Sequence, residues 1–329
     1  MSRFLTVLLC LLTPLAAHAR CDGTDLIAAL PATEQQALSD RANATAYPNG
    51  LLWQAVRDDT TITLFGTYHF EHARTSAHLA ALTPLIDQAD SVYLEVSNAD
   101  QTQLQRELAD DPSIMFITEG DTLPDLLGEE DWQRLSAEMQ ARAIPGFMAA
   151  KFKPFWAAMM LGIGPCEARN AATKENGIDK QIGDYASSIG NDSRSLEDFR
   201  TLLTLFDSFP LEEQLDMIRL LFASSGDADD LAYTLRQRYL AQEVALIWEF
   251  SRLVSLKFGG ATAEADFALF EEQLLIKRNR EWIDLLIRDA PGKNLFLAVG
   301  AAHLPGDYGV LRLLEEQGFT IKRLPFDAL

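Results

Sequence analysis

The sequence is short of basic residues, with 28 Lys and Arg against 48 Asp and Glu and a formal net charge of −20. This shortage argues against nucleic acid as a partner, because a polyanion must be met by patches of Lys and Arg. Hydrophobic residues make up 48% of the chain. Disorder is therefore excluded as the main state, since a chain this apolar can offset the entropy lost on folding.

Long apolar runs are also missing, except at the start. After residue 19 no stretch approaches about 18 uninterrupted apolar residues, so no membrane span is expected beyond that point. Residues 1–19 have the features of a secretory signal peptide: Arg3 gives a positive start, residues 4–12 are apolar, and A-H-A at 17–19 suits a signal peptidase. We expect cleavage before Arg20 and a periplasmic or secreted protein.

Cysteine is scarce, with three in the chain, and one of them, Cys10, lies in the signal segment. The two that remain, Cys21 and Cys166, are predicted to form a disulfide, because paired thiols usually oxidise in an exported protein. The alternative is two unpaired buried thiols. With both cysteines bridged, a Cys nucleophile is not expected.

Apolar, strand-like segments lie near both ends of the chain, at residues 51–56, 61–65, 91–96, 294–299 and 319–323, with a short one at 193–196. The sequence between them is mostly helical in its pattern. Neither end has enough strands for a sheet of its own, so both ends must share one. The sequence therefore predicts one α/β domain over residues 20–329, with a central mixed sheet built from both chain ends and a large helical insertion at about 121–289.

The common catalytic signatures are missing. H-E-x-x-H, G-x-S-x-G, the P-loop and G-x-G-x-x-G do not occur. Two histidines, however, share a local pattern. An apolar strand runs into glycine and histidine follows three positions later, once as G-T-Y-H at 66–69 and once as G-A-A-H at 300–303. The site must therefore be sought among histidines and carboxylates.

This repeated pattern is expected to place His69 and His303 at the C-terminal edge of the sheet, where open α/β sheets bind their ligands. Glu95 lies near the end of a third strand, and a carboxylate in so apolar a segment needs a partner, because burying it alone is costly. We expect these three side chains to meet. His72 and His78 are expected to be exposed helix residues.

A second group of candidates comes later in the chain. The segment K-R-N-R-E-W at 277–282 puts three cations into an otherwise amphipathic helix. Arg278 and Asn279 are adjacent and point about 100° apart, so one of them is expected to face inward. An inward Arg pairs with a carboxylate or holds an anionic or carbonyl oxygen. Glu197, at the end of the short strand, is a similar candidate.

These segments resemble the TraB/GumN family, which includes the Tiki proteases. The order and spacing match over roughly residues 51–323, and the most specific part is the closing segment, V-G-A-A-H-L-P-G at 299–306. The resemblance implies an α/β fold shared with erythromycin esterases and haem-binding ChaN-like proteins. It also implies one site formed by both G-x-x-H motifs and the glutamates. By position, the residues of that site are His69, Glu95, Glu197, Arg278, Asn279 and His303.

The resulting hypothesis is an exported hydrolase, specifically a metal-dependent peptidase, because the Tiki branch is identified with metal-dependent proteolysis. His69, Glu95 and His303 are predicted to bind zinc, manganese or cobalt, which lowers the pKa of a bound water toward 7. Proton transfer is assigned to Glu197, and oxyanion stabilisation to Arg278 with Asn279. The reverse assignment, with Glu197 as ligand and Glu95 as base, stays open.

Two alternatives stay open. One is a metal-free, esterase-like hydrolase in which a histidine held by Glu95 is the general base. The other is a protein that binds a peptide signal or haem and does no chemistry. The substrate is expected to be a peptide or a small molecule, and the sequence gives no indication of oligomeric state.

Overall fold

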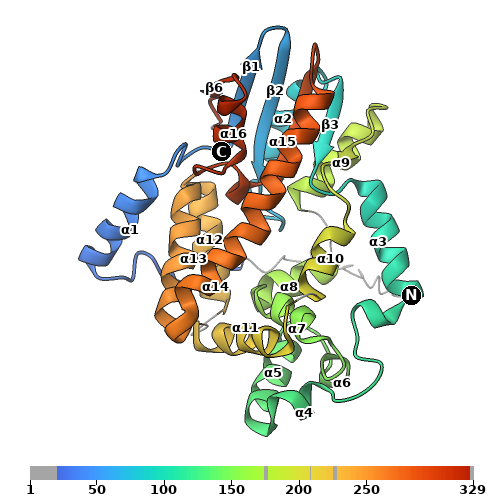
Figure 1. Ribbon diagram of the computed structural model, residues 1–329, viewed down its shortest axis with the longest axis vertical. Helices are drawn as coiled ribbons and strands as arrows, with labels where there is room; N and C mark the ends of the chain where they lie inside the picture. Colours follow the sequence, from blue (N-terminus) through green and yellow to red (C-terminus); the bar gives the residue numbers. More distant parts are fainter. Residues whose placement is uncertain (1–20, 174–176, 208, 225–227, 327–329) are drawn as a thin grey trace, which may run out of the picture.

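A computed structural model of the chain describes residues 21–173, 177–207, 209–224 and 228–326 (Figure 1). The predicted signal peptide at 1–19 and its cleavage before Arg20 lie outside the described residues. The strands are β1 (Leu52–Arg57), β2 (Thr60–Thr67), β3 (Ser91–Leu94), β4 (Arg194–Ser195), β5 (Asn294–Gly300) and β6 (Thr320–Arg323). They form one sheet in the order β4-β3-β5-β2-β1-β6.

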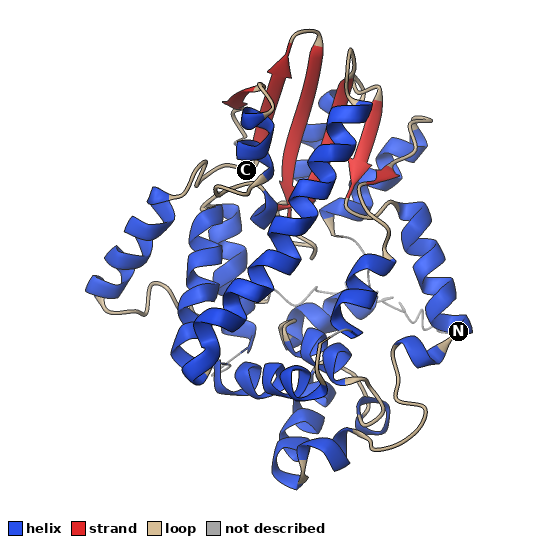
Figure 2. Cartoon of the chain, viewed as in Figure 1, coloured by secondary structure: helices blue, strands red, loops and turns tan. Residues whose placement is uncertain are grey.

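The sheet is mixed and draws its strands from both ends of the chain, which confirms the predicted fold class. β1 and β2 form an antiparallel hairpin, and β6 pairs antiparallel with the outer side of β1. The other pairings, β2 with β5, β5 with β3 and β3 with β4, are all parallel. Four parallel strands therefore end at the same edge, and Figure 2 shows the sheet at one end of the molecule with most helices beyond that edge.

Helices make up most of the rest of the described chain. The α-helices are α1 (Ala32–Ala44), α2 (Thr75–Ile86), α3 (Asn98–Asp110), α4 (Leu123–Leu127), α5 (Glu129–Ala141), α6 (Gly146–Ala149), α7 (Pro154–Leu161), α8 (Pro165–Thr173), α9 (Ile178–Ser188), α10 (Arg200–Asp207), α11 (Leu211–Ser224), α12 (Ala228–Leu240), α13 (Val244–Phe258), α14 (Ala263–Glu271), α15 (Lys277–Asp289) and α16 (Val310–Glu316). Short 3₁₀ turns are η1 (Pro112–Ile114), η2 (Gly260–Thr262) and η4 (Ala301–His303), and η3 (Glu272–Ile276) is a π-helical turn.

The helical part of the chain differs from the predicted insertion in two ways. Helices begin at Asn98, ahead of residue 121, because α3 directly follows β3. The block is also interrupted by β4, which returns to the sheet and pairs with β3. The chain therefore leaves the sheet twice, and the second return places residues 194–197 beside the end of β3.

Both faces of the sheet are covered. Side chains alternate along each strand, so β2 sends Ile62 and Leu64 to one face and Phe65 to the other. α15 and α16 pack on the first face, through residues such as Trp282 and Leu311. α2 and α9 pack on the second face, and Figure 1 shows α15 crossing the sheet on the side opposite α2. This double burial explains why β2, β3 and β5 read as continuous apolar runs.

The predicted disulfide is confirmed: Cys21 is bonded to Cys166 across 145 positions of sequence. The bond fixes the N-terminal segment to the start of α8. The next residue, Glu167, accepts a hydrogen bond from Arg236 at 2.8 Å and another from the Tyr68 hydroxyl at 2.9 Å. The disulfide therefore lies next to a buried polar cluster, and this cluster holds Tyr68, the residue before His69.

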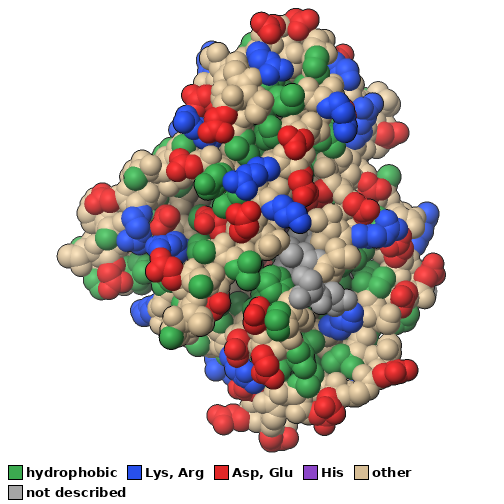
Figure 3. All heavy atoms as spheres, viewed as in Figure 1, with side chains coloured by type: hydrophobic (Ala, Val, Ile, Leu, Met, Phe, Trp, Pro, Cys, Tyr) green, Lys and Arg blue, Asp and Glu red, His purple; other side chains and the backbone are tan. Residues whose placement is uncertain are grey.

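The surface carries charges of both signs. On the face shown in Figure 3, acidic and basic side chains are interspersed, and the basic ones do not gather into a single patch. Among the described residues, no helix has both the length and the apolar character needed to cross a bilayer.

Candidate functional site

The strand ends bring the predicted site residues to one edge of the sheet. Thr67 at the end of β2 is in register with Gly300 at the end of β5, and Leu94 at the end of β3 is in register with Ser195 of β4. The candidate side chains follow these ends directly, within three residues in each case: His69, Glu95, Glu197 and His303. The predicted meeting of two distant G-x-x-H motifs is therefore what the topology produces.

Gly300 lies at the centre of this group. A Cβ atom at Gly300 would lie 3.1 Å from Glu95 Oε1, 3.5 Å from His69 Nε2 and 3.6 Å from His303 Cδ2. The amide of Gly300 also donates a hydrogen bond to Glu95 Oε1 at 2.6 Å. Glycine here keeps open a small space that both imidazoles and one carboxylate share.

His303 is buried in η4, and its ring is fixed from both sides. The amide nitrogen of Asn279 donates to the Tyr308 carbonyl at 2.8 Å, so Asn279 Oδ1 is the atom that faces His303 Nδ1, at 2.6 Å. The proton of the imidazole therefore lies on Nδ1, and Nε2, which carries the lone pair, lies 3.8 Å from Glu95 Oε1. The Trp282 ring packs against the imidazole at 4.4 Å between centroids.

His69 lies on the open side of the group. Its side chain is 62% exposed, and its Nδ1 is 3.0 Å from Asp179 Oδ2 in the first turn of α9. The charge of Asp179 is the main reason that the pKa of His69 is raised to about 9. The imidazole is accordingly protonated at neutral pH in this state, and its Nε2 points toward Gly300.

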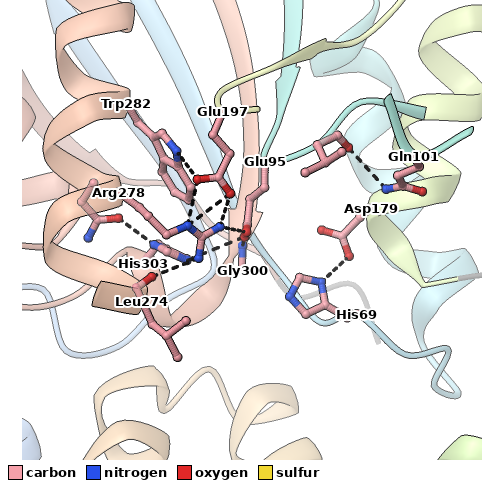
Figure 4. A network of polar contacts seen from close by, with 12 residues as sticks. His69, Glu95, Gln101, Asp179, Glu197, Leu274, Arg278, Trp282, Gly300 and His303 are labelled. Atoms are coloured by element: carbon pink, nitrogen blue, oxygen red, sulfur yellow. Dashed lines mark hydrogen bonds and ion pairs between the residues drawn. The ribbon is translucent and has the colours of Figure 1, made fainter. Parts of the chain in front are cut away.

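Arg278 joins the two glutamates on the other side of the site (Figure 4). Its Nη2 donates to Glu95 Oε2 at 2.6 Å and to Glu197 Oε1 at 2.5 Å. Its Nε donates to Glu197 Oε2 at 2.9 Å. Its Nη1 donates to the Leu274 carbonyl at 3.0 Å and to His303 Nε2 at 3.3 Å. All five N–H donors of the guanidinium are engaged, so the predicted oxyanion role would require one of these bonds to break.

Both Arg278 and Asn279 are buried, which corrects the expectation that one of them faces inward. Both residues lie in the first turn of α15. There Arg278 contacts the glutamates that follow the strands, while Asn279 contacts His303 in η4. The π-helical turn η3 precedes them, and such turns inside helices are frequent at functional sites. The Leu274 carbonyl in this turn accepts the side chain of Arg278.

Charge within the cluster determines how its carboxylates titrate. Burial by itself would raise the pKa of Glu95, but the two histidines, the Arg278 guanidinium and the Gly300 amide outweigh burial and lower it to about 2. For Glu197, burial is the largest effect and its pKa is raised, although Arg278 opposes this. Burial likewise lowers the pKa of His303 to about 3. Glu95 is therefore ionised and His303 neutral throughout the physiological range.

Two residues of the site were missed from the sequence. Trp282 contacts His303 and donates to Glu197 Oε2 at 3.4 Å. Its spacing from Arg278, four positions along the helix, is a usable signal, since residues i and i+4 share a helix face. Asp179 has no such signal, because only the packing of α9 on the sheet brings it to His69.

His72 and His78 are buried, which overturns the expectation that they are exposed. Their rings lie 5.0 Å apart, and aromatic side chains surround them, with Phe326 at 4.9 Å from His78 and Tyr239 at 5.6 Å from His72. Burial is the main reason that their pKa values are lowered, to about 3 for His72 and about 4 for His78. Local sequence could not reveal this in full, because two of the covering aromatics, Tyr239 and Phe326, come from distant segments.

These buried histidines predict that the protein loses stability in mild acid. The unfolded chain binds a proton at each histidine below about pH 6.5 while the folded chain does not, so this contribution is complete above that pH and is lost as the pH falls toward 4. For His78 the loss between pH 7.5 and pH 5 is about 2 kcal/mol. We expect the free energy of unfolding, measured with urea at pH 7.5 and pH 5, to fall by about 2 kcal/mol less in His78→Phe than in wild type. Equal drops in variant and wild type would contradict this.

Gly66 is the glycine of the G-T-Y-H motif, and it is packed closely against the other motif. Its replacement is expected to lower the stability of the fold. A Cβ at Gly66 would lie 2.9 Å from Leu304 Cδ1 and 3.0 Å from the Cα of Ala301 in η4. Because backbone cannot give way, Gly66→Ala should lower the free energy of unfolding by about 1–3 kcal/mol, as overpacked cores do. Denaturant unfolding measures this, and an unchanged midpoint would contradict the close packing of the two motifs.

This chain thus combines a mixed α/β sheet with two strand-ending G-x-x-H segments that meet at one edge beside carboxylates from neighbouring strands. A model described as the TraB/PrgY/gumN family matches residues 51–323. The match runs from β1 to β6 and includes every site residue named above. The chain therefore belongs to the TraB/PrgY/gumN family, as the resemblance predicted. Comparison with curated proteins gives no match.

The donor set of the site fits the divalent ion that the resemblance implies. His69 Nε2 and Glu95 Oε1 lie beside Gly300, and His303 Nε2 lies 3.8 Å from the same carboxylate oxygen. Each imidazole has its Nδ1 bonded to an oxygen, of Asp179 or of Asn279. Among the described residues, no three His, Cys, Asp or Glu side chains are arranged closely enough to hold a metal ion as they stand. Here the cation in contact with both Glu95 and His303 is Arg278.

Proposed function

We propose that this chain is an exported hydrolase that uses a divalent metal ion held by His69, Glu95 and His303. The observation that carries the proposal is the orientation of the two imidazoles. Each has Nδ1 bonded to an oxygen, and each has Nε2 on the side of Glu95: His69 Nε2 lies with Glu95 Oε1 beside Gly300, and His303 Nε2 lies 3.8 Å from Glu95 Oε1. Histidines that bind metals characteristically donate their other ring N–H to a carboxylate or a carbonyl oxygen in this way.

The bound ion would supply a water of lowered pKa and polarise a carbonyl group. The chain's own residues prepare the site for it. Asp179 and Asn279 orient the imidazoles, and Arg278 holds Glu95 in place. The exposed side of His69 is where a substrate would approach, because His303 and Glu197 are buried against Trp282. Glu197 is bonded to Arg278 and Trp282, so its assignment as the base stays a prediction from sequence.

A peptide is the substrate class we propose, and zinc, manganese or cobalt the ion, since imidazole and carboxylate ligands suit all three. Export is part of the proposal: the signal-like residues 1–19 and the Cys21–Cys166 disulfide both suit an oxidising compartment. The metal-free alternative assigns Glu95 to hold a basic histidine. Glu95 instead bonds to the Gly300 amide and Arg278, and other groups hold the histidines.

The test compares wild type with the double variant His69→Ala, His303→Ala, and uses His78→Phe as a histidine control outside the site. Metal content by elemental analysis is expected to be about one ion per chain in wild type and control and absent from the double variant. Hydrolysis of a peptide mixture should stop with chelator and return with manganese, cobalt or zinc. Activity that survives chelation, or equal metal in the double variant, would overturn the proposal.

A further inference from the structure

Arg278 has a position unusual for a side chain beside a metal site. Its guanidinium is buried and contacts Glu95, Glu197 and His303 together, at 2.6, 2.5 and 3.3 Å. The contact to His303 is made to Nε2, which carries the lone pair because Nδ1 donates to Asn279. Arg278 therefore takes up the one lone pair through which His303 could bind a metal ion.

The charges lead to the same conclusion. Glu95 and Glu197 bring two negative charges to the buried side of the site, and Arg278 neutralises one of them. A divalent ion at Glu95 and His303 would lie within a few ångströms of the guanidinium, where like charges repel and little water screens them. Arg278 thus weakens the site's attraction for a cation as well as occupying a ligand.

We propose that Arg278 is an internal competitor for the divalent ion. In the metal-free site it takes the place of the ion at His303 and Glu95, which holds these groups together and limits metal affinity. When metal binds, Nη1 leaves His303, while Nε and Nη2 can keep Glu197. This inference rests on the proposed function and adds a control of metal occupancy to it.

The test measures Mn²⁺ binding to chelator-treated protein, by isothermal titration calorimetry and by the electron paramagnetic resonance of free Mn²⁺. Arg278→Gln removes the charge and the contact to His303. Arg280→Gln is the matched control, because Arg280 lies on the same helix and is 53% exposed, with contacts to Glu272 at 3.6 Å and to the Tyr308 ring at 4.9 Å that do not involve the proposed ligands. We expect Arg278→Gln to bind Mn²⁺ at least tenfold more tightly than wild type and Arg280→Gln to bind as wild type does.

A purely supportive role for Arg278 gives the opposite result, because loss of support loosens ligands and weakens binding. Equal or weaker binding by Arg278→Gln would therefore overturn the inference. If that variant folds only with Mn²⁺ present, the ion has replaced the arginine, which supports the inference. If it does not fold at all, Arg278→Lys decides: it keeps the charge but cannot contact all three partners, and it should bind severalfold more tightly than wild type.

The two proposals can fail separately. Mn²⁺ binding by wild type that is not tightened in either Arg278 variant would overturn only the competitor role. No Mn²⁺ binding by wild type or by any variant would overturn both. Tight binding by Arg278→Gln that disappears when His303→Ala is added would support both, since it places the ion at the lone pair that Arg278 had taken.

Discussion

Replacement of Glu95 by Gln is expected to lower peptide hydrolysis more than about 100-fold, because residues that only orient a metal ligand already cost 10–100-fold when changed. The substitution keeps the shape of the side chain and an oxygen that can accept from the Gly300 amide. It removes the charge that we assign to the metal ion. Steady-state rates and Mn²⁺ affinity measure the two consequences together.

The matched control for this variant is Glu243→Gln. Glu243 also pairs with an arginine, at 2.9 Å, but its side chain is 39% exposed and its partner is Arg238 and not Arg278. Its replacement should leave both hydrolysis and metal affinity at the wild-type level. If Glu95→Gln hydrolysed peptides as fast as the control, Glu95 would have no part in the chemistry and the assignment of ligands would be wrong.

Gly300→Ala is expected to lower metal affinity and hydrolysis by about tenfold each, because a misplacement of about 1 Å can cost about 100-fold and the displacement here is smaller. Stability should change little, since the backbone of Gly300, at φ −48° and ψ 132°, is one that alanine adopts without strain. The added methyl group would lie 3.1 Å from Glu95 Oε1, so this carboxylate must shift by a few tenths of an ångström, while the 3.5 Å distance from the methyl group to His69 Nε2 is an ordinary contact.

Gly162→Ala is the control for this variant, because Gly162 follows α7 with helical backbone angles and its added Cβ would meet nothing closer than 3.4 Å. Together with Gly66→Ala, the comparison separates the roles of the two motif glycines: loss of stability at Gly66 and loss of metal binding at Gly300. A Gly300→Ala protein that binds metal normally would show that the space at Gly300 is not the metal site.

Much of the fold and part of the site could be predicted from sequence because strand ends are local signals. An apolar run that stops at glycine fixes where a strand ends, and parallel strands bring such ends to one edge. His69 and His303 follow their glycines at the same spacing, so a local pattern predicted a contact between residues far apart in the chain. The need of a buried Glu95 for a partner likewise followed from its apolar neighbours.

The remaining features depend on packing that no local pattern encodes. Asp179 reaches His69 only because α9 crosses the sheet near the end of β2. The polar sequence around His72 and His78 favours exposure, yet Tyr239 and Phe326 cover them from distant parts of the chain. Adjacent residues of a helix usually face different surroundings. Arg278 and Asn279 also have different partners here, but both side chains are buried.

The most direct test of the central claim is a crystal structure of the protein soaked with Mn²⁺, with the ion located by its anomalous scattering. We expect one ion at roughly 2.0–2.3 Å from His69 Nε2, His303 Nε2 and a carboxylate oxygen of Glu95, with the guanidinium of Arg278 moved off His303. An ion bound elsewhere, or one that contacts neither histidine, would contradict the account.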